Sequence, residues 1–208
     1  MMTPWNGAAR KLTRPFRRDH IVPMAPPVLQ GPFTVETYQR LAELGVLGAD
    51  ARVELIHGQV VEMSPIGDRH ASCVRRLNTL FAPAVPAHAI VDVQNPIVLG
   101  AHDAPQPDLV VLKPRADAYP RHPLAADAIL IIEVADTTLA YDRDVKIPLY
   151  AGAGIPEVWL VDLGAEAIRV YRQPAPDGYG EILTVTRGEL LRPLLLPGTV
   201  IAADGILG

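Results

Sequence analysis

Two acidic residues stand at the ends of apolar segments, where their side chains could bind a cation. Asp108 follows Pro107 and opens the segment LVVL, and Glu133 closes the apolar run ILII. Both segments have the length and composition of buried strands, and a carboxylate is seldom buried without a partner. If the two strands are neighbours, their acids meet and repel each other unless a positive charge lies between them. The pattern therefore predicts a cation site shared by Asp108 and Glu133.

Mg²⁺ is the cation that such a pair favours, with Mn²⁺ as a substitute, because hard cations take oxygen ligands and Mg²⁺ keeps several of its waters. Lys146 follows on a predicted helix and could orient or deprotonate a water at this cation. Deprotonation requires the lysine pKa to fall from its usual value of about 10.4. Structural interpretations stay open: Asp108 could accept backbone hydrogen bonds, Glu133 could pair with a surface arginine, and Lys146 could be an exposed helix lysine.

The first half of the chain predicts two helices and a hairpin around these residues. FTVETYQRLAELG predicts a helix with Thr34 as its N-cap. RVELIHGQVVEMSP predicts a hairpin with its turn at His57-Gly58. DRHASCVRRLNTLFAPAV predicts a second helix with Asp68 as its cap. The next predicted strand, AIVDVQNPIVLG, contains Pro96 and is therefore either an edge strand or an interrupted one.

The second half predicts further strands and one helix. Ile129 to Val134, PEVWLVDL and AIRVYRQP are strand-like, and the C-terminal part predicts a hairpin and a return strand. The helix that carries Lys146 should begin late, because Pro148 would damage a helix interior but is tolerated in a first turn. Strands interleaved with helices predict one α/β or α+β domain over residues 31–208, in which helices flank a mixed sheet.

Residues 1–30 differ in composition from the rest of the chain. They hold five basic residues and one acid, a charge of +4, whereas the whole chain has a net charge of −4, so the remainder carries −8. The segment is rich in proline and lacks periodicity, which predicts a disordered basic tail. Such a tail could contact nucleic acid, although a solvated extension or a misassigned start is the favoured interpretation.

Composition excludes several classes of protein. The chain has 208 residues, of which 49% are apolar and 20% charged, and this is typical of a globular protein with a sizeable core. No apolar run approaches the roughly 20 residues of a membrane helix. The N-terminus has no secretory pattern, so we expect a cytoplasmic protein with no membrane partner. Cys73 is the only cysteine, which excludes an internal disulfide and a multi-cysteine metal site. The phosphate-loop, HExxH and GxSxG motifs are absent.

Glu54 and His70 are further candidates, each with two interpretations. Strand alternation puts Glu54 on the same face as Arg52, so an exposed ion pair fits the pattern as well as a site role does. His70 lies on the apolar face of the second predicted helix, which favours a core histidine over a catalytic one. The sequence leaves both choices open.

Other charged and aromatic residues have default structural roles. Arg69 and Arg76 share a helix face and could contact phosphates, although a solvated face is the default. Asp142 and Asp144 are predicted to favour the start of the following helix through its dipole. Tyr150 is predicted to lie in the core.

Five segments occur in an order that resembles a known family: ELIHGQ, PDLVVL, IIEVADTT, KIPLY and GIPEVWLVD. Together they resemble the Uma-two family of restriction endonucleases in the PD-(D/E)XK nuclease superfamily. The resemblance covers residues 33–200, roughly the whole predicted domain. It implies a restriction-endonuclease-like fold, in which helices flank a central mixed β-sheet with added β-hairpins.

The resemblance also implies roles for individual residues. Asp108 and Glu133 would bind the metal. The superfamily lysine usually stands two positions after the second acid, where this chain has Ala135, and the resemblance moves that role to Lys146. Glu54 matches a further acid of the family and would be a second metal ligand or a positioning group.

We therefore expect a Mg²⁺-dependent endonuclease that hydrolyses DNA by a metal-activated water. Cleavage of both strands would favour a homodimer with two sites. The acidic body argues against strong non-specific DNA affinity, which depends largely on Lys and Arg. Two alternatives remain: a non-catalytic interaction module that keeps the nuclease fold, and a phosphodiesterase directed at RNA or nucleotides.

Overall fold

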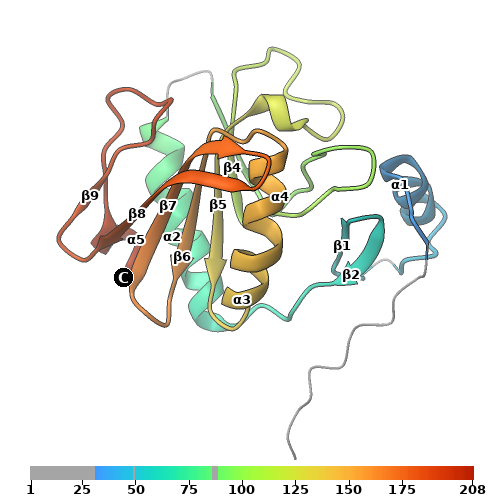
Figure 1. The fold of residues 1–208 in the computed structure, drawn as a ribbon, viewed down its shortest axis with the longest axis horizontal. Coiled ribbons are helices and arrows are strands. Elements are labelled where there is room, and N and C mark those ends of the chain that lie inside the picture. The colour runs from blue at the N-terminus through green and yellow to red at the C-terminus, as the bar shows by residue number, and fades with distance from the viewer. Residues whose placement is uncertain (1–30, 49, 86–88) are drawn as a thin grey trace, which may run out of the picture.

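A six-stranded mixed sheet forms the centre of the molecule, and helices cover both of its faces (Figure 1). The computed structural model describes residues 31–48, 50–85 and 89–208; the predicted basic tail, residues 1–30, lies outside the described residues. Within the described part of the chain, no helix is long and apolar enough to cross a membrane. The predicted fold class, a mixed sheet flanked by helices with added hairpins, is confirmed.

The strands of the central sheet follow one another in space in chain order. They are β3 (Ile90–Val93), β4 (Leu109–Leu112), β5 (Ala128–Ala135), β6 (Glu157–Asp162), β7 (Ala167–Ala175) and β8 (Gly178–Thr186). β5 and β6 are parallel, and the other neighbouring strands are antiparallel. A helical crossover joins the parallel pair, as such a connection requires.

Two small sheets and several helices surround the central sheet. The small sheets pair β1 (Val53–Ile56) with β2 (Gln59–Glu62), and β9 (Leu190–Leu191) with β10 (Ile201–Ala202). The helical segments are α1 (Val35–Glu43), α2 (Asp68–Ala84), η1 (Ala125–Asp127), α3 (Leu139–Tyr141), η2 (Asp142–Lys146), α4 (Ile147–Gly152) and α5 (Ala203–Leu207). β3 is an edge strand that ends before Pro96, as predicted from the proline.

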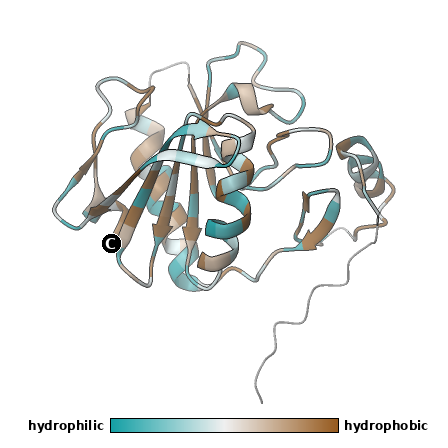
Figure 2. Cartoon of the chain, in the orientation of Figure 1, coloured by the Kyte–Doolittle hydropathy of each residue, from teal (hydrophilic) through white to brown (hydrophobic). Residues whose placement is uncertain are grey.

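Alternation along β5 builds two separate cores, one on each face of the sheet. Leu130, Ile132 and Val134 pack in the cluster that includes α2 and α5, and Ile131 and Ala135 pack in the cluster that includes α4. Figure 1 shows α2 behind the strands and α4 in front of them, and Figure 2 shows the apolar character of the strands between these helices. Because side chains alternate along a strand, Glu133 faces the same side as Ile131 and Ala135, the side covered by α4.

The C-terminal helix α5 packs on α2. Arg76 donates from Nε to the Ile206 carbonyl at 2.9 Å and from Nη2 to the Leu207 carbonyl at 3.0 Å. Both bonds satisfy carbonyls at a helix end that have no partner within the helix. Arg76 therefore fastens α5 to α2, and the predicted choice between a solvated face and phosphate contact does not apply to it.

Cys73 lies under this contact and is expected to resist alkylation in the native protein. It has no exposed surface, and its Sγ lies 3.5 Å from the Ile206 carbonyl oxygen. Burial raises the pKa of the thiol to about 11, although the nearby Arg76 opposes this shift. Only the thiolate reacts, so iodoacetamide at pH 8 should label urea-unfolded protein and leave native protein unlabelled, as measured by intact mass. Rapid labelling of the native protein would contradict stable packing of α5.

α1 and the β1–β2 hairpin share a third, smaller core. It contains Tyr38, Leu55, Val60 and Ala104. The predicted hairpin is confirmed, with a two-residue turn at His57-Gly58. Both turn residues have positive φ, +50° and +73°, as a type I′ turn requires. Thr34 caps α1 as predicted, because its Oγ1 accepts from the Thr37 N–H at 3.2 Å.

One predicted helix start is wrong and another is confirmed. The N-cap of α2 is Gly67, which has no side chain to accept a bond, and Asp68 is the first helical residue. α4 begins late, at Ile147, with Pro148 in its first turn as predicted. Lys146 lies just before α4, in the π-type turn η2, where the Ile147 N–H bonds to the Asp142 carbonyl five residues back. The sequence did not predict this turn.

Glu157, at the start of β6, is a fully buried acid with several protein partners. Its Oε1 accepts from Trp159 Nε1 at 2.8 Å and lies 2.9 Å from Arg172 Nη2, and its Oε2 accepts from the Leu194 N–H at 2.5 Å. These bonds join β6 to β7 and to the loop after β9. Glu157 does not line the cavity described below.

Glu157→Gln is therefore expected to destabilise the fold. The change leaves Arg172, whose side chain is 20% exposed, without its counter-charge. Loss of one partner of a buried pair costs about 3 kcal/mol, and we expect about 2 kcal/mol after allowing for this exposure. Urea denaturation followed by circular dichroism measures the effect. Glu166→Gln, which removes the exposed partner of Arg187, is the control and should leave the midpoint unchanged; equal midpoints for both variants would contradict the prediction.

Candidate active site

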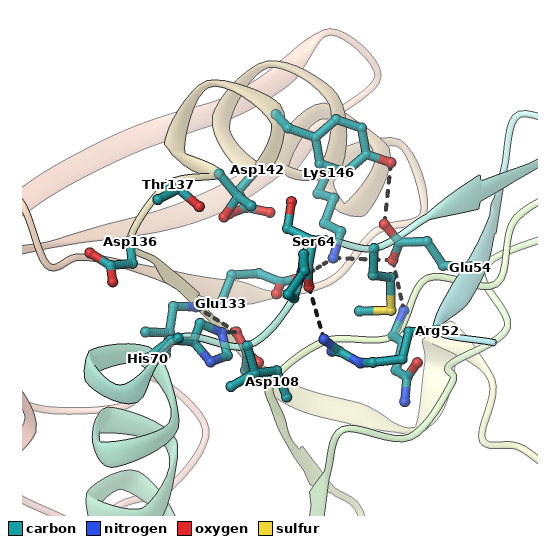
Figure 3. A pocket seen from close by; sticks show the side chains of 18 of the residues that line it. Arg52, Glu54, Ser64, His70, Asp108, Glu133, Asp136, Thr137, Asp142 and Lys146 are labelled. Atoms are coloured by element: carbon teal, nitrogen blue, oxygen red, sulfur yellow. Dashed lines mark hydrogen bonds and ion pairs between the residues drawn. The ribbon is translucent and has the colours of Figure 1, made fainter. Parts of the chain in front are cut away.

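A cavity of about 710 Å³ lies where β4 and β5 meet the β1–β2 hairpin and the helical segment η2 (Figure 3). The four residues predicted from the sequence, Glu54, Asp108, Glu133 and Lys146, all line it. Each of the four is at most 7% exposed. The structure thus brings together acids from three strands and a lysine from a helical turn.

The β4–β5 register explains why the two strand-end acids meet. The ladder pairs Leu109 with Ile132, so Asp108 and Glu133 occupy the next opposed positions. Asp108 Oδ2 accepts from the Val134 N–H at 2.9 Å, which extends the contact between the strands. A second bond joins Asp108 Oδ1 to Gln94 Nε2 at 3.1 Å. Two predicted buried strands that are true neighbours therefore place both carboxylates in one cavity.

Glu133 is the most strongly perturbed acid of the cavity. Its Oε1 accepts from the Tyr150 hydroxyl at 2.5 Å and lies 3.3 Å from Lys146 Nζ. Burial raises the pKa of Glu133 to about 8; Lys146 opposes the rise, while the acids Asp142 and Asp108 add to it. Tyr150 is buried as predicted, but its hydroxyl also holds a site carboxylate. Burial, together with the two neighbouring acids, therefore outweighs the ammonium group and favours the protonated form of Glu133 while no cation is bound.

Lys146 bridges two acids from different parts of the chain. Its Nζ lies 3.1 Å from Glu54 Oε2 and 3.3 Å from Glu133 Oε1. Burial alone would lower the pKa of Lys146, but Glu133, Glu54 and Asp142 outweigh burial and raise it. Lys146 is therefore an ammonium group at neutral pH. The fall in pKa that a deprotonating lysine would need is not found, and orientation or charge stabilisation remains as its expected role.

Glu54 is buried and fully engaged, not exposed beside Arg52. Its Oε1 accepts from the Tyr141 hydroxyl at 3.2 Å, and its Oε2 accepts from the Gln106 N–H at 3.1 Å as well as from Lys146. The β1–β2 hairpin and its small core with α1 position Glu54 at the cavity. Both oxygens of Glu54 therefore have protein partners, as both oxygens of Asp108 do.

Asp142 also lines the cavity. From the sequence it was expected only to favour the start of the helix. It is 4% exposed, and its Oδ2 accepts from the Thr138 hydroxyl at 2.6 Å. Burial raises the pKa of Asp142 to about 6, although Lys146 opposes the rise. Asp142 and Asp144 do lie in the first turn of η2, as predicted, but the burial of Asp142 in the cavity was not predicted. Asp144, by contrast, is exposed and pairs with its neighbour Arg143.

His70 faces the cavity from α2, and its role as a simple core histidine is not supported. Its Nε2 lies 3.0 Å from Asp108 Oδ2, and its Nδ1 is buried without a hydrogen-bond partner among the described residues. The helical spacing predicted that the His70 side chain points inward, but it did not predict the acid that it contacts.

Arg69, one position earlier, donates to Asp136 at 3.0 Å and to the Leu163 carbonyl at 2.6 Å. Its side chain is exposed, but it has these two protein partners.

The donor set of the cavity fits a hard divalent cation. Asp108 and Glu133 offer carboxylate oxygens, and no protein partner is found for Glu133 Oε2 within residues 31–48, 50–85 and 89–208. The same residues contain no group of three or more His, Cys, Asp or Glu side chains arranged to hold a metal. This excludes an all-protein cage there but not Mg²⁺, which is often held by one or two carboxylates, waters and substrate phosphates.

Comparisons with known proteins agree with this geometry. The model of the family Uma2, described as "Putative restriction endonuclease", matches residues 35–204. A solved structure, that of a putative nuclease of family DUF820 from Anabaena variabilis, aligns with a TM-score of 0.60 and 17% sequence identity, covering 85% of this chain and 98% of that one. A search of curated proteins found no match. At this identity the solved structure supports the fold, and the family match supports a nuclease function in general.

Proposed function

We propose, from the premise that this chain belongs to the Uma2 family, that its cavity is the active site of a divalent-metal-dependent endonuclease. The substrate would be DNA, hydrolysed at its phosphodiester bonds. The observation that carries the proposal is the convergence of Asp108 and Glu133, from adjacent strands, beside the ammonium group of Lys146. This is an arrangement of hard oxygen ligands and one fixed cation in a buried site.

Asp108 and Glu133 would hold Mg²⁺ or Mn²⁺. When bound, the cation would polarise the phosphate and lower the pKa of a water at the site. Lys146, held by Glu54 at 3.1 Å, would stabilise the negative charge that develops on the phosphate oxygens. The Val134 N–H and His70 would hold the Asp108 carboxylate in place, as outer partners of metal ligands commonly do.

The test is a cleavage assay on supercoiled plasmid, single-stranded DNA and RNA, with Mg²⁺, Mn²⁺ or EDTA. We expect cleavage of DNA with either cation and none with EDTA. Cleavage of RNA alone would favour the RNA-directed alternative. No cleavage of any substrate, together with no thermal shift on adding either cation, would overturn the proposal in favour of an interaction module.

The oligomeric state is a separate part of the proposal. A homodimer would present two equivalent sites. Light scattering coupled to size-exclusion chromatography tests this. A monomer at working concentrations would contradict the dimer without affecting the chemistry of a single site.

A further inference from the structure

Most of the charged side chains that line the cavity are acidic, which is unusual for a site that must accept a polyanion. Two cationic side chains line it, Arg52 and Lys146, against six acidic ones, a formal charge of −4; the acids are Glu54, Glu62, Asp108, Glu133, Asp136 and Asp142. Lys146 is already engaged by two of these acids. One bound divalent cation would leave the cavity at −2, so its walls do not attract phosphates strongly.

Arg52 carries the one guanidinium group among the residues that line the cavity, and this group is hydrogen-bonded to the protein backbone. Its Nη1 donates to the Ser64 carbonyl at 2.8 Å, which holds the segment between β2 and α2 over the cavity (Figure 3). Duplex DNA presents a charge about every 1.7 Å, and proteins that bind it meet several phosphates at once with Lys and Arg. Among the residues that the structure describes, the lining of this cavity contains no such row of cations, and the exposed Arg69 beside it is paired with Asp136.

Two segments that line the cavity come close together at one end. A side-chain carbon added at Gly67, at the end of the β2–α2 segment, would lie 3.8 Å from Asp136 Oδ2 on the segment after β5. The two segments that form the walls therefore approach each other closely there. The acids lie beneath them, and the catalytic candidates are almost fully buried. A scissile phosphate must reach into this space, away from the bulk of a second strand.

The wall formed by the β2–α2 segment is apolar. Met63, Pro65 and Ile66 line the cavity, and Ile66 is 42% exposed. The bases of an unpaired strand present flat apolar faces that proteins contact without reading sequence, whereas bases in a duplex are stacked on one another. A volume of about 710 Å³ lies in the range of pockets that enclose a small ligand.

We infer that the site acts on unpaired nucleic-acid strands: a single-stranded segment or strand end enters the cavity, and its bases contact the wall at Ile66. This inference rests on the proposed nuclease function and names the substrate class of the same site. An unpaired strand carries half the charge density of a duplex, and few of its phosphates need to lie near the acidic walls.

The test compares three 5′-labelled DNA substrates of one sequence: a single strand, a blunt duplex and a duplex with a single-stranded overhang. With Mn²⁺, we expect the single strand and the overhang to be cleaved at least about tenfold faster than the blunt duplex. Equal rates on blunt duplex and single strand would overturn this inference and leave the nuclease function standing. No cleavage of any of the three would overturn both.

A matched pair of variants tests the apolar wall. Ile66→Asp should lower single-strand cleavage about tenfold, whereas Leu195→Asp should leave it unchanged. Leu195 is a similarly exposed apolar residue, 47% exposed, that does not line the cavity. Binding of the labelled single strand to Asp108→Asn, followed by fluorescence anisotropy, should fall weakly with salt, with a log–log slope of about −1 to −2 for few phosphate contacts. Equal effects of the two aspartates, or a steep slope, would overturn the inference.

Discussion

Asp108→Asn and Glu133→Gln are each expected to lower metal-dependent cleavage by about a thousandfold, equivalent to about 4 kcal/mol of transition-state stabilisation. Each substitution keeps the shape of the side chain and removes the charge that would hold a cation. The two acids sit opposite each other at the end of the β4–β5 ladder, so they should act as a unit. The double variant should therefore be little worse than either single variant.

Initial rates on the best DNA substrate measure this effect, and Mn²⁺ binding followed by electron paramagnetic resonance measures the metal site separately. Both variants should weaken Mn²⁺ binding at least about tenfold. Glu157→Gln is the matched control, because it removes another buried acid of the same sheet outside the cavity. Its folded fraction should cleave normally. Full activity in both acid variants, or lost activity with unchanged Mn²⁺ affinity, would refute the assignment of metal ligands.

Lys146→Met should destabilise the fold by about 3 kcal/mol at pH 8, the cost typical of breaking a buried ion pair. Methionine keeps the length of the side chain but leaves Glu133 and Glu54 without the ammonium group that lies 3.3 Å and 3.1 Å from them. Cleavage should also fall, because charge on the phosphate would lose its fixed partner. Stability is the sharper measure, since it needs no substrate or metal.

The stability lost in Lys146→Met should be smaller at low pH than at high pH. The pKa of Glu133 is raised to about 8 and that of Asp142 to about 6. A raised pKa favours the protonated form in the folded state, so stability is greatest below the unfolded pKa and falls as pH rises through the folded value. The Lys146→Met variant should therefore lose less stability at pH 5 than at pH 8, as measured by urea denaturation.

A double variant provides the control for this pH effect. Glu133→Gln in the Lys146→Met background removes one of the stranded charges and should recover part of the stability at pH 8. No recovery would mean that the methionine acts through packing. If Lys146→Met were as stable as the wild type at pH 8, the buried charge cluster would not have the energetic role described here.

Strand patterns in the sequence were sufficient to bring the two acids together. Runs of apolar residues around Leu109 and Ile131 identified two buried strands, and the register makes these strands neighbours with Asp108 and Glu133 at opposed positions. The hairpin turn at His57-Gly58 was equally readable, because few residue pairs support positive φ at two adjacent positions. Local rules of this kind work where one geometry is strongly preferred.

What the sequence left open depends on geometry that no local pattern specifies. Asp142 and Tyr141 line the cavity beside a π-type turn, which the sequence did not predict. Glu54 was predicted as a candidate, but its burial depends on how the separate hairpin core docks beside the sheet. The contact of His70 with Asp108 likewise requires the packing of α2 against the sheet.

The wide turn at residues 142–146 makes the site sensitive to chain length as well as to residue type. Successive residues of a regular helix are rotated by about 100°, so deletion of one residue within the turn would rotate Tyr141 relative to Lys146 by about that angle. The hydroxyl that reaches Glu54 and the ammonium that shares the same acid could then no longer face it together. The extra residue of the wide turn and Lys146 therefore depend on each other. A chain with a regular turn here would need another way to place an ammonium group beside Glu54.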